Sequence, residues 1–156
     1  MRRDDRAITD PARLDAIIRA GRFANCALIA PDGPYVVTLS HGYDAERGRL
    51  YFHVAHEGEK LDAIAIDARA CVTVVVAGEY LQGECAHPYE SVVMRGTMRV
   101  VTDADEKRHA IRVLVEHLED DPETYWVSRS LDEPARTAGF TALCFEISEV
   151  TGKAGS

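Results

Sequence analysis

The sequence of 156 residues lacks the short motifs that mark several large enzyme classes. It has no nucleophile elbow, no Walker loop, no Gly-x-Gly-x-x-Gly turn and no His-Glu-x-x-His helix. Paired carboxylates for acid–base catalysis are also missing, because Glu57 and Glu59 flank a turn and Asp120 and Asp121 lie in a polar segment. These absences weigh against hydrolases and nucleoside triphosphate enzymes. Since the side chains supply no evident reactive centre, a bound cofactor is the more plausible carrier of any chemistry.

Cysteine pairs at metal-ligand spacing are absent as well. The four cysteines form no Cys-x-x-Cys pair, and three of them lie in apolar runs that resemble strands, so we expect buried free thiols. Cys85 and His87 could form half of a zinc site, but no second pair follows at zinc spacing. The sequence therefore predicts no metal.

The chain has fewer basic than acidic residues. Against 26 acidic residues stand 18 Lys and Arg, which gives a net charge of -8 and opposes binding to nucleic acid or anionic membranes. Residues 1–6 are charged, with no apolar stretch for a signal peptide or membrane span, so we expect a soluble cytoplasmic protein. With 46% hydrophobic residues, the chain is predicted to form one domain over 1–156.

Residues 23–29 and 35–43 read as two strands joined by a Pro-Asp-Gly-Pro turn, which is typical of a hairpin. In the second strand, the face with Val36, Thr38 and Ser40 is small and partly polar. A flat aromatic ligand could approach such a face, and an ordinary solvent-facing surface explains it at least as well.

The most informative segment is 50–62, which reads as a buried strand, a glycine turn and a helix start. The period of two places His53 on the face opposite the core. The turn at Gly58 leads into a helix whose first N–H groups attract anions, and Lys60 adds a full charge. The segment can hold a phosphate; a solvated lysine on a ligand-free turn is the alternative.

The second half of the chain predicts a helix and three more strands, the last of which has Leu143, Phe145 and Ile147 on one face. Residues 71–77 are almost continuously apolar, which indicates a strand covered on both faces. In 91–101 alternation puts Arg95 on the non-core face, and Gly96 marks a bulge or a close approach of another group. Asp103 and Glu106 resemble a capping box that starts a helix.

Residues 120–138 read as a polar, proline-interrupted loop that carries the sole tryptophan, Trp126, which either packs onto the domain or contacts a ligand or partner. In all, about six strands and two or three short helices are expected, mostly without crossover helices of βαβ length. The predicted fold class is mainly β (α+β), an antiparallel barrel with peripheral helices.

Several segments together resemble the FMN-binding split-barrel superfamily, related to pyridoxamine 5′-phosphate oxidase, and within it the nitroimidazole-resistance branch. The resemblance rests on residues 1–3 with 6–10, DGPYVVTL (32–39), GYD (42–44), LYFHVA (50–55), GEKLD (58–62), YESVV (89–93) and VTGK (150–153). It implies a six-stranded antiparallel split β-barrel that forms a homodimer, with FMN in clefts between the subunits.

The resemblance also implies a set of cofactor contacts. Short side chains and backbone would line the isoalloxazine, a strand end would run along the cofactor, and a lysine would pair with its phosphate; the residues are Val37, Thr38, Leu39, Ser40, His53, Val54 and Lys60, with Ser91 as a further contact. Arg95 and Trp126 are added on chemical grounds, since a guanidinium suits a phosphate or the flavin's electron-rich edge and an indole can cover a ring.

The chain departs from the family pattern at two places. Relatives commonly read Pro-Leu-Asn-Phe where this chain has Thr-Leu-Ser-His at 38–41, so the ring contact and the preference for FMN over FAD are open. The Arg-Lys pair of pyridoxamine 5′-phosphate oxidases is reduced to Lys60, which argues against vitamin B6 oxidation.

Three functions follow as hypotheses. The first is an FMN-dependent oxidoreductase acting on a small redox-active molecule, such as a nitroaromatic or quinone-like compound, with His53 as proton donor or merely bonded to its neighbours. The second is a flavin carrier or redox sensor without turnover. The third is haem binding, with His41, His53, His56 or His87 as axial ligand.

Overall fold

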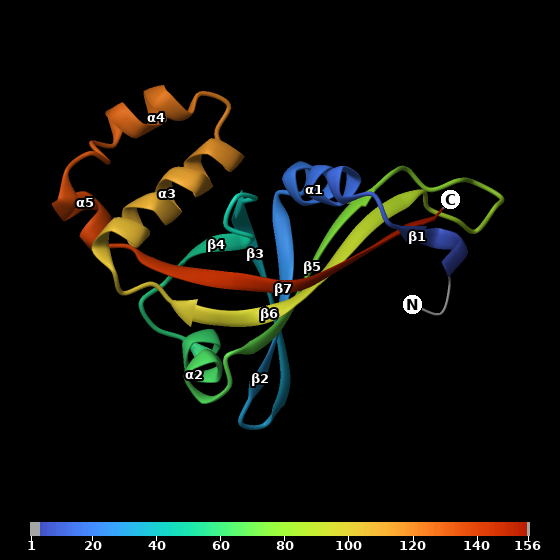
Figure 1. Ribbon diagram of the computed structural model, residues 1–156, viewed down its shortest axis with the longest axis horizontal. Coiled ribbons are helices and arrows are strands. Elements are labelled where there is room, and N and C mark those ends of the chain that lie inside the picture. Colours follow the sequence, from blue (N-terminus) through green and yellow to red (C-terminus); the bar gives the residue numbers. More distant parts are fainter. Residues whose placement is uncertain (1–3, 156) are drawn as a thin grey trace.

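The strands of the computed structural model, which describes residues 4–155, form one antiparallel sheet that closes on itself (Figure 1). The sheet order is β1-β7-β4-β3-β2-β5-β6, and β6 pairs again with β7. The strands are β1 (Ala7–Ile8), β2 (Phe23–Ala30), β3 (Gly33–Asp44), β4 (Arg49–Val54), β5 (Arg69–Ala77), β6 (Tyr89–Val100) and β7 (Thr141–Gly155). The expected antiparallel barrel is confirmed. The strand number differs from the predicted six, because the two-residue β1 adds to the edge of β7 outside the closed ring.

The helices lie around the barrel, as predicted, but they are more numerous. They are α1 (Pro11–Ala20), α2 (Glu59–Ile66), α3 (Ala104–Leu118), α4 (Pro122–Ser128) and α5 (Pro134–Ala138), after a 3-10 turn η1 (Asp4–Arg6). The segment 120–138, expected to be a loop, contains α4 and α5. Each of these begins with a proline at its first turn, where the missing N–H costs nothing. Figure 1 shows α3, α4 and α5 gathered at one end of the barrel.

The core fills the barrel interior, and alternation along the strands explains it. In β4, Leu50, Phe52 and Val54 face the core, as predicted. Tyr51 points the other way and is also buried, because α3 covers that part of the outer surface. His53, one step further along the same outer face, lies beyond this cover and is exposed.

Two strand predictions have different outcomes. Gly96 does mark a bulge: the β6–β7 register shifts between Arg95 and Gly96, and a Cβ at Gly96 would lie 1.9 Å from the carbonyl oxygen of Glu146. The prediction that residues 71–77 are covered on both faces is wrong for this chain alone. Burial alternates along β5, and Val75 is 49% exposed on the outer face.

Among the described residues, no helix is long and apolar enough to cross a membrane, and no group of three or more His, Cys, Asp or Glu could hold a metal ion. All four cysteines are free. Cys26 and Cys144 are buried and Cys71 is partly buried, as expected for thiols in strands, whereas Cys85 is exposed in the loop between β5 and β6.

Candidate functional site

The outer face of β3, where the family resemblance implies the cofactor contacts, carries short, exposed side chains. Thr38 and Ser40 are exposed, and the Thr38 hydroxyl donates a 2.7 Å hydrogen bond to Oδ1 of Asn25 on β2. Val37 and Leu39 point the other way and pack against the core. A ring lying on β3 would therefore meet the side chains of Thr38 and Ser40, but only the backbone of Val37 and Leu39.

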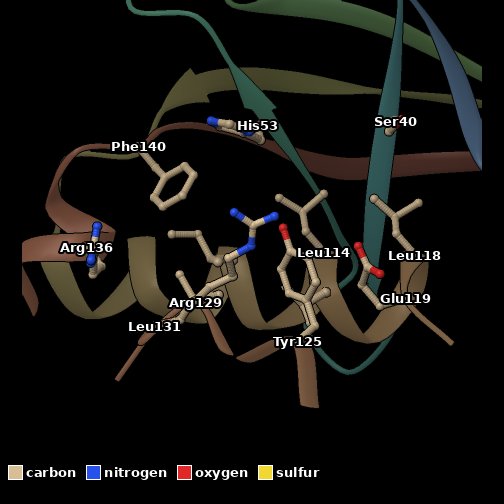
Figure 2. A pocket seen from close by; sticks show the side chains of 12 residues that line it. Ser40, His53, Leu114, Leu118, Glu119, Tyr125, Arg129, Leu131, Arg136 and Phe140 are labelled. Carbon is tan, nitrogen blue, oxygen red and sulfur yellow. The ribbon is translucent and has the colours of Figure 1, made fainter. Parts of the chain in front are cut away.

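Ser40 and His53 lie just past the point where β3 and β4 stop pairing. The β3–β4 ladder ends at His41 and Phe52; beyond it Ser40 pairs with Phe23 of β2, and His53 pairs with Ala142 of β7. Figure 2 shows the two residues apart on their separate strands, beside the same cleft. Ser40 and His53 therefore border one cleft from two different strands.

Phe140 supports the His53 ring. Phe140 immediately precedes β7, whose Ala142 pairs with His53, and the two rings meet edge to face with centroids 4.7 Å apart. Burial lowers the pKa of His53, and neighbouring His56 lowers it further, so the ring is neutral at pH 7. His56 is itself held by a 2.5 Å hydrogen bond between its Nδ1 and the Thr141 hydroxyl.

Ser40 and His53 open into a cleft of about 630 Å³ between the barrel and the terminal helices (Figure 2). Its floor is apolar and comes mainly from α3, and its far wall comes from α4, α5 and the segment between them. The lining residues beyond the barrel are Ile111, Leu114, Val115, Leu118, Glu119, Tyr125, Arg129, Leu131, Arg136 and Phe140. A cleft of this kind, apolar with a few polar groups, is typical of small-molecule sites.

The sequence did not point to this wall. The wall residues Tyr125, Arg129, Arg136 and Phe140 lie in or beside the segment 120–138, for which the sequence predicts a loop. The available signal was the pair of Asp-Pro and Glu-Pro dipeptides, which place an N-cap and a first-turn proline at the start of two short helices.

The predicted phosphate corner follows β4 at the start of α2. Gly58 is the N-cap, with φ +131, a backbone conformation suited to glycine, and no side chain caps the first N–H groups of α2. Lys60 is half-buried, and a Cβ at Gly58 would lie 3.5 Å from its Nζ. The same turn carries Glu59 and Asp62, so Lys60 supplies its positive charge among acidic neighbours.

The remaining predicted contacts lie elsewhere. Val54 is buried in the core. Trp126 is buried among α3 and α4 side chains, with the guanidinium of Arg112 5.1 Å from its ring centre, and does not line the cleft. Ser91 and Arg95 lie on the outer face of β6, separated from β3 by β2 and β5, or roughly 14 Å at the usual strand spacing. Arg95 there forms a 3.8 Å ion pair with Glu149.

Comparison with known proteins identifies the family. The family model for pyridoxamine 5′-phosphate oxidase matches residues 10–154. The chain belongs to this family. No protein with a curated description shows significant sequence similarity to it. Of the segments that carried the resemblance, residues 1–3 lie outside the described part of the structure.

Solved structures share the fold. A proposed 5-nitroimidazole antibiotic resistance protein from Bacteroides thetaiotaomicron superposes with a TM-score of 0.79 at 24% identity, covering 95% of this chain and 86% of that one. A flavocytochrome from Azotobacter vinelandii superposes with a TM-score of 0.80 at 19% identity, covering 100% of this chain and 72% of that one. An FAD- and haem-binding protein from Mycobacterium smegmatis superposes with a TM-score of 0.73 at 21% identity, covering 97% of this chain and 74% of that one. At such identities the similarity establishes the split-barrel fold.

The described residues fit a flavin. A planar ring needs a face of short side chains, which Thr38 and Ser40 provide. It also needs a polar group at its edge, which His53 provides. A phosphate needs unpaired N–H donors and a cation, which the Gly58 turn and Lys60 provide. These features lie along consecutive stretches of one hairpin and the helix that follows it.

Proposed function

We propose that this chain binds FMN on the outer face of β3 and β4 and acts as an oxidoreductase on a small redox-active molecule held in the cleft. The observation that carries the proposal is the position of Ser40 and His53, which join the low β3 surface to the 630 Å³ cleft. When bound, FMN would supply the redox chemistry that the protein's own side chains lack. The neighbours from Azotobacter, a flavocytochrome, and from Mycobacterium, an FAD- and haem-binding protein, support a flavin as the bound group, and the sequence resemblance is the reason for choosing FMN over FAD.

His53 is the candidate catalytic residue. Within the described residues neither of its ring nitrogens has a hydrogen-bond partner, so both can face a bound molecule. Its lowered pKa keeps the ring neutral at pH 7, with one nitrogen donating and the other accepting. Phe140 packs edge to face against the ring, and the ring borders the apolar cleft. His53 can therefore orient an acceptor or pass it a proton.

The outer surface of the barrel supports the proposed homodimer. Exposed apolar side chains on β2, β3, β5 and β6 lie within one curved face, which we call the barrel face. They are Phe23, Ile29, Val36, Val75 and Val93. Isolated exposed apolar residues are common, but several on one face indicate a partner surface. A second copy across this face would bring Ser91 and Arg95 toward the cofactor of its neighbour. The cytoplasmic location stays a prediction from the sequence.

The first experiment is a visible spectrum of the protein as purified, followed by mass identification of the molecule released on heating. Flavin absorption bands and a mass equal to that of FMN are expected; FAD would correct the cofactor, and a colourless protein that binds no added flavin would contradict the proposal. Reoxidation of the reduced protein in stopped flow then separates an enzyme from a carrier. Acceleration by a nitroaromatic or quinone over oxygen alone is expected, and equal rates would leave flavin carrier or redox sensor as the function.

Haem binding is the second candidate, because two of the neighbours bind haem and the free nitrogens of His53 offer an axial ligand. The other histidines are poorer candidates: His41 is fully buried, and His56 is bonded to Thr141. A Soret band in the purified protein that is lost in His53→Ala would favour haem.

A further inference from the structure

Two arginines on the far wall of the cleft give it a charge that the family match does not assign. Arg129 follows α4 and Arg136 lies on α5, and both line the cleft that contains His53. Figure 2 shows the Arg129 guanidinium in the middle of the cleft, beside Tyr125, and Arg136 near Phe140. Their side chains thus enter the cleft from the wall opposite the barrel.

Most other arginines in this acidic chain are held by carboxylates. The ion-paired ones in the described part are Arg13, Arg22, Arg47, Arg49, Arg69, Arg95, Arg99, Arg108 and Arg112. Among the described residues, Arg129 contacts the ring of Tyr125 at 5.5 Å and has no carboxylate partner, and the Arg136 side chain has none either. Both guanidiniums can bind an anion without first breaking an ion pair.

The rest of the cleft selects the shape of that anion. Leu114, Val115, Leu131 and Phe140 give the cleft an apolar lining beside the arginines. Glu119 stands at the opposite end of the cleft from Arg136 (Figure 2) and repels a second negative charge there. A molecule with one anionic end and a flat apolar body matches this distribution of charge and surface.

We propose that the substrate of the redox reaction is such an amphipathic monoanion, an aromatic carboxylate in chemical class, with its carboxylate on Arg129 and its apolar body beside Phe140 and His53, while Arg136 adds positive charge at the Phe140 end of the cleft. The proposal rests on the proposed function, because it places this molecule in the cleft that the flavin adjoins. A chain with a net charge of -8 repels anions at long range, so local guanidiniums must supply the attraction.

Isothermal titration calorimetry with 2-naphthoate and its neutral counterpart 2-naphthamide tests this on the protein as purified. We expect the carboxylate to bind at least ~10-fold more tightly than the amide, and Arg129→Gln to weaken naphthoate binding ~10-fold, since a charge-assisted hydrogen bond contributes about that factor. Arg136→Gln should weaken naphthoate binding less, because it removes a charge that does not contact the carboxylate. Naphthamide binding should stay unchanged in both variants.

Arg108→Gln is the matched control, because Arg108 lies on exposed α3 surface, pairs with Asp132 at 2.8 Å and does not line the cleft. It removes the same charge and should leave naphthoate binding unchanged. Equal affinity for naphthoate and naphthamide, or equal weakening by all three variants, would overturn the proposal. The flavin content of each preparation, read from its visible spectrum, separates this outcome from failure of the proposed function: flavin present with no preference for the carboxylate refutes only the substrate class.

Discussion

The rings of His41 and His117 lie with centroids 4.7 Å apart and a tilt of 48°, where α3 packs on β3. His41 donates through Nε2 to the carbonyl oxygen of Ile18 at 3.0 Å, and His117 donates through Nε2 to that of Gly21 at 2.8 Å. The Nδ1 atom of His41 is buried without a partner among the described residues. These two histidines therefore connect α3, β3 and the end of α1.

This pair makes the fold sensitive to acid. Burial lowers the pKa of His41 to about 4 from 6.5; the bond to Ile18 opposes this shift and His117 adds to it. Below pH 6.5 the unfolded chain takes up a proton that the folded chain refuses, so the free energy of unfolding falls as the pH drops from about 6.5 to about 4. At 1.36 kcal/mol per pKa unit the loss is about 3 kcal/mol.

Urea unfolding across this pH range checks the expectation with His41→Gln, whose amide can still donate to Ile18 but does not titrate. The variant should lose less stability than the wild type between pH 6.5 and 4, whereas His87→Gln, in an exposed loop, should follow the wild type. Parallel curves for His41→Gln and wild type would show that His41 is not responsible.

Loss of Lys60 should weaken FMN binding. Lys60→Ala removes the cation beside the uncapped start of α2, and we expect a cost of about 1.5–3 kcal/mol, or roughly 10- to 150-fold in Kd, with little effect on folding. Fluorescence titration of cofactor-free protein with FMN measures it. Glu59→Ala removes a charge of opposite sign from the same turn and should leave affinity unchanged or higher. Equal Kd values for Lys60→Ala and wild type would place the phosphate elsewhere.

The sequence predicted the barrel because its strands follow simple rules. Alternation correctly divided β3 into an inward face with Val37 and an outward face with Thr38, and it placed His53 opposite the core. These assignments depend only on the period of two and on hairpin turns, which are local properties. The bulge at Gly96 could be predicted for the same reason, because a glycine within an alternating strand is a local signal.

The far wall of the cleft escaped prediction for a physical reason. α4 and α5 are short, and their stability comes from packing on α3 rather than from helix propensity. Trp126 therefore packs within that cluster, which is one of the two positions that the sequence left open for it, and it is not the ring contact added to the cofactor site on chemical grounds. The approach of Arg129 and Arg136 to His53 depends on how α3 folds back over the barrel, a tertiary contact that no local pattern encodes.

Glu106 should prove important for holding α3 on the barrel. Its backbone N–H is capped by Asp103 at 2.8 Å, as expected, but its carboxylate turns to the barrel instead of back to the cap, and accepts hydrogen bonds from Arg99 at 2.7 and 2.9 Å. Bonds from Arg99 outweigh burial and lower the pKa of Glu106. Glu106→Gln should cost about 1–3 kcal/mol in the free energy of unfolding.

Chemical unfolding at pH 7 measures this loss, with Asp105→Asn as the control. Asp105 lies in the same helical turn and carries the same charge, but its side chain is exposed. A loss confined to Glu106→Gln supports the anchor, and an equal loss in both variants would attribute the effect to the helix dipole instead.

The proposed dimer predicts that one charge on the barrel face separates the subunits. Val36 is 62% exposed on β3, next to Thr38 on the same outer face, and a carboxylate there would be desolvated if a second copy covers it. Sedimentation equilibrium should give wild type twice the chain mass of 17.2 kDa and Val36→Glu the mass of one chain. Val127→Glu, on α4 with 69% exposure, adds the same charge away from the barrel face and should stay dimeric. Because the cofactor is proposed to lie between the subunits, Val36→Glu should also release FMN on gel filtration; a wild-type monomer, or a dimeric Val36→Glu, would contradict this placement of the interface.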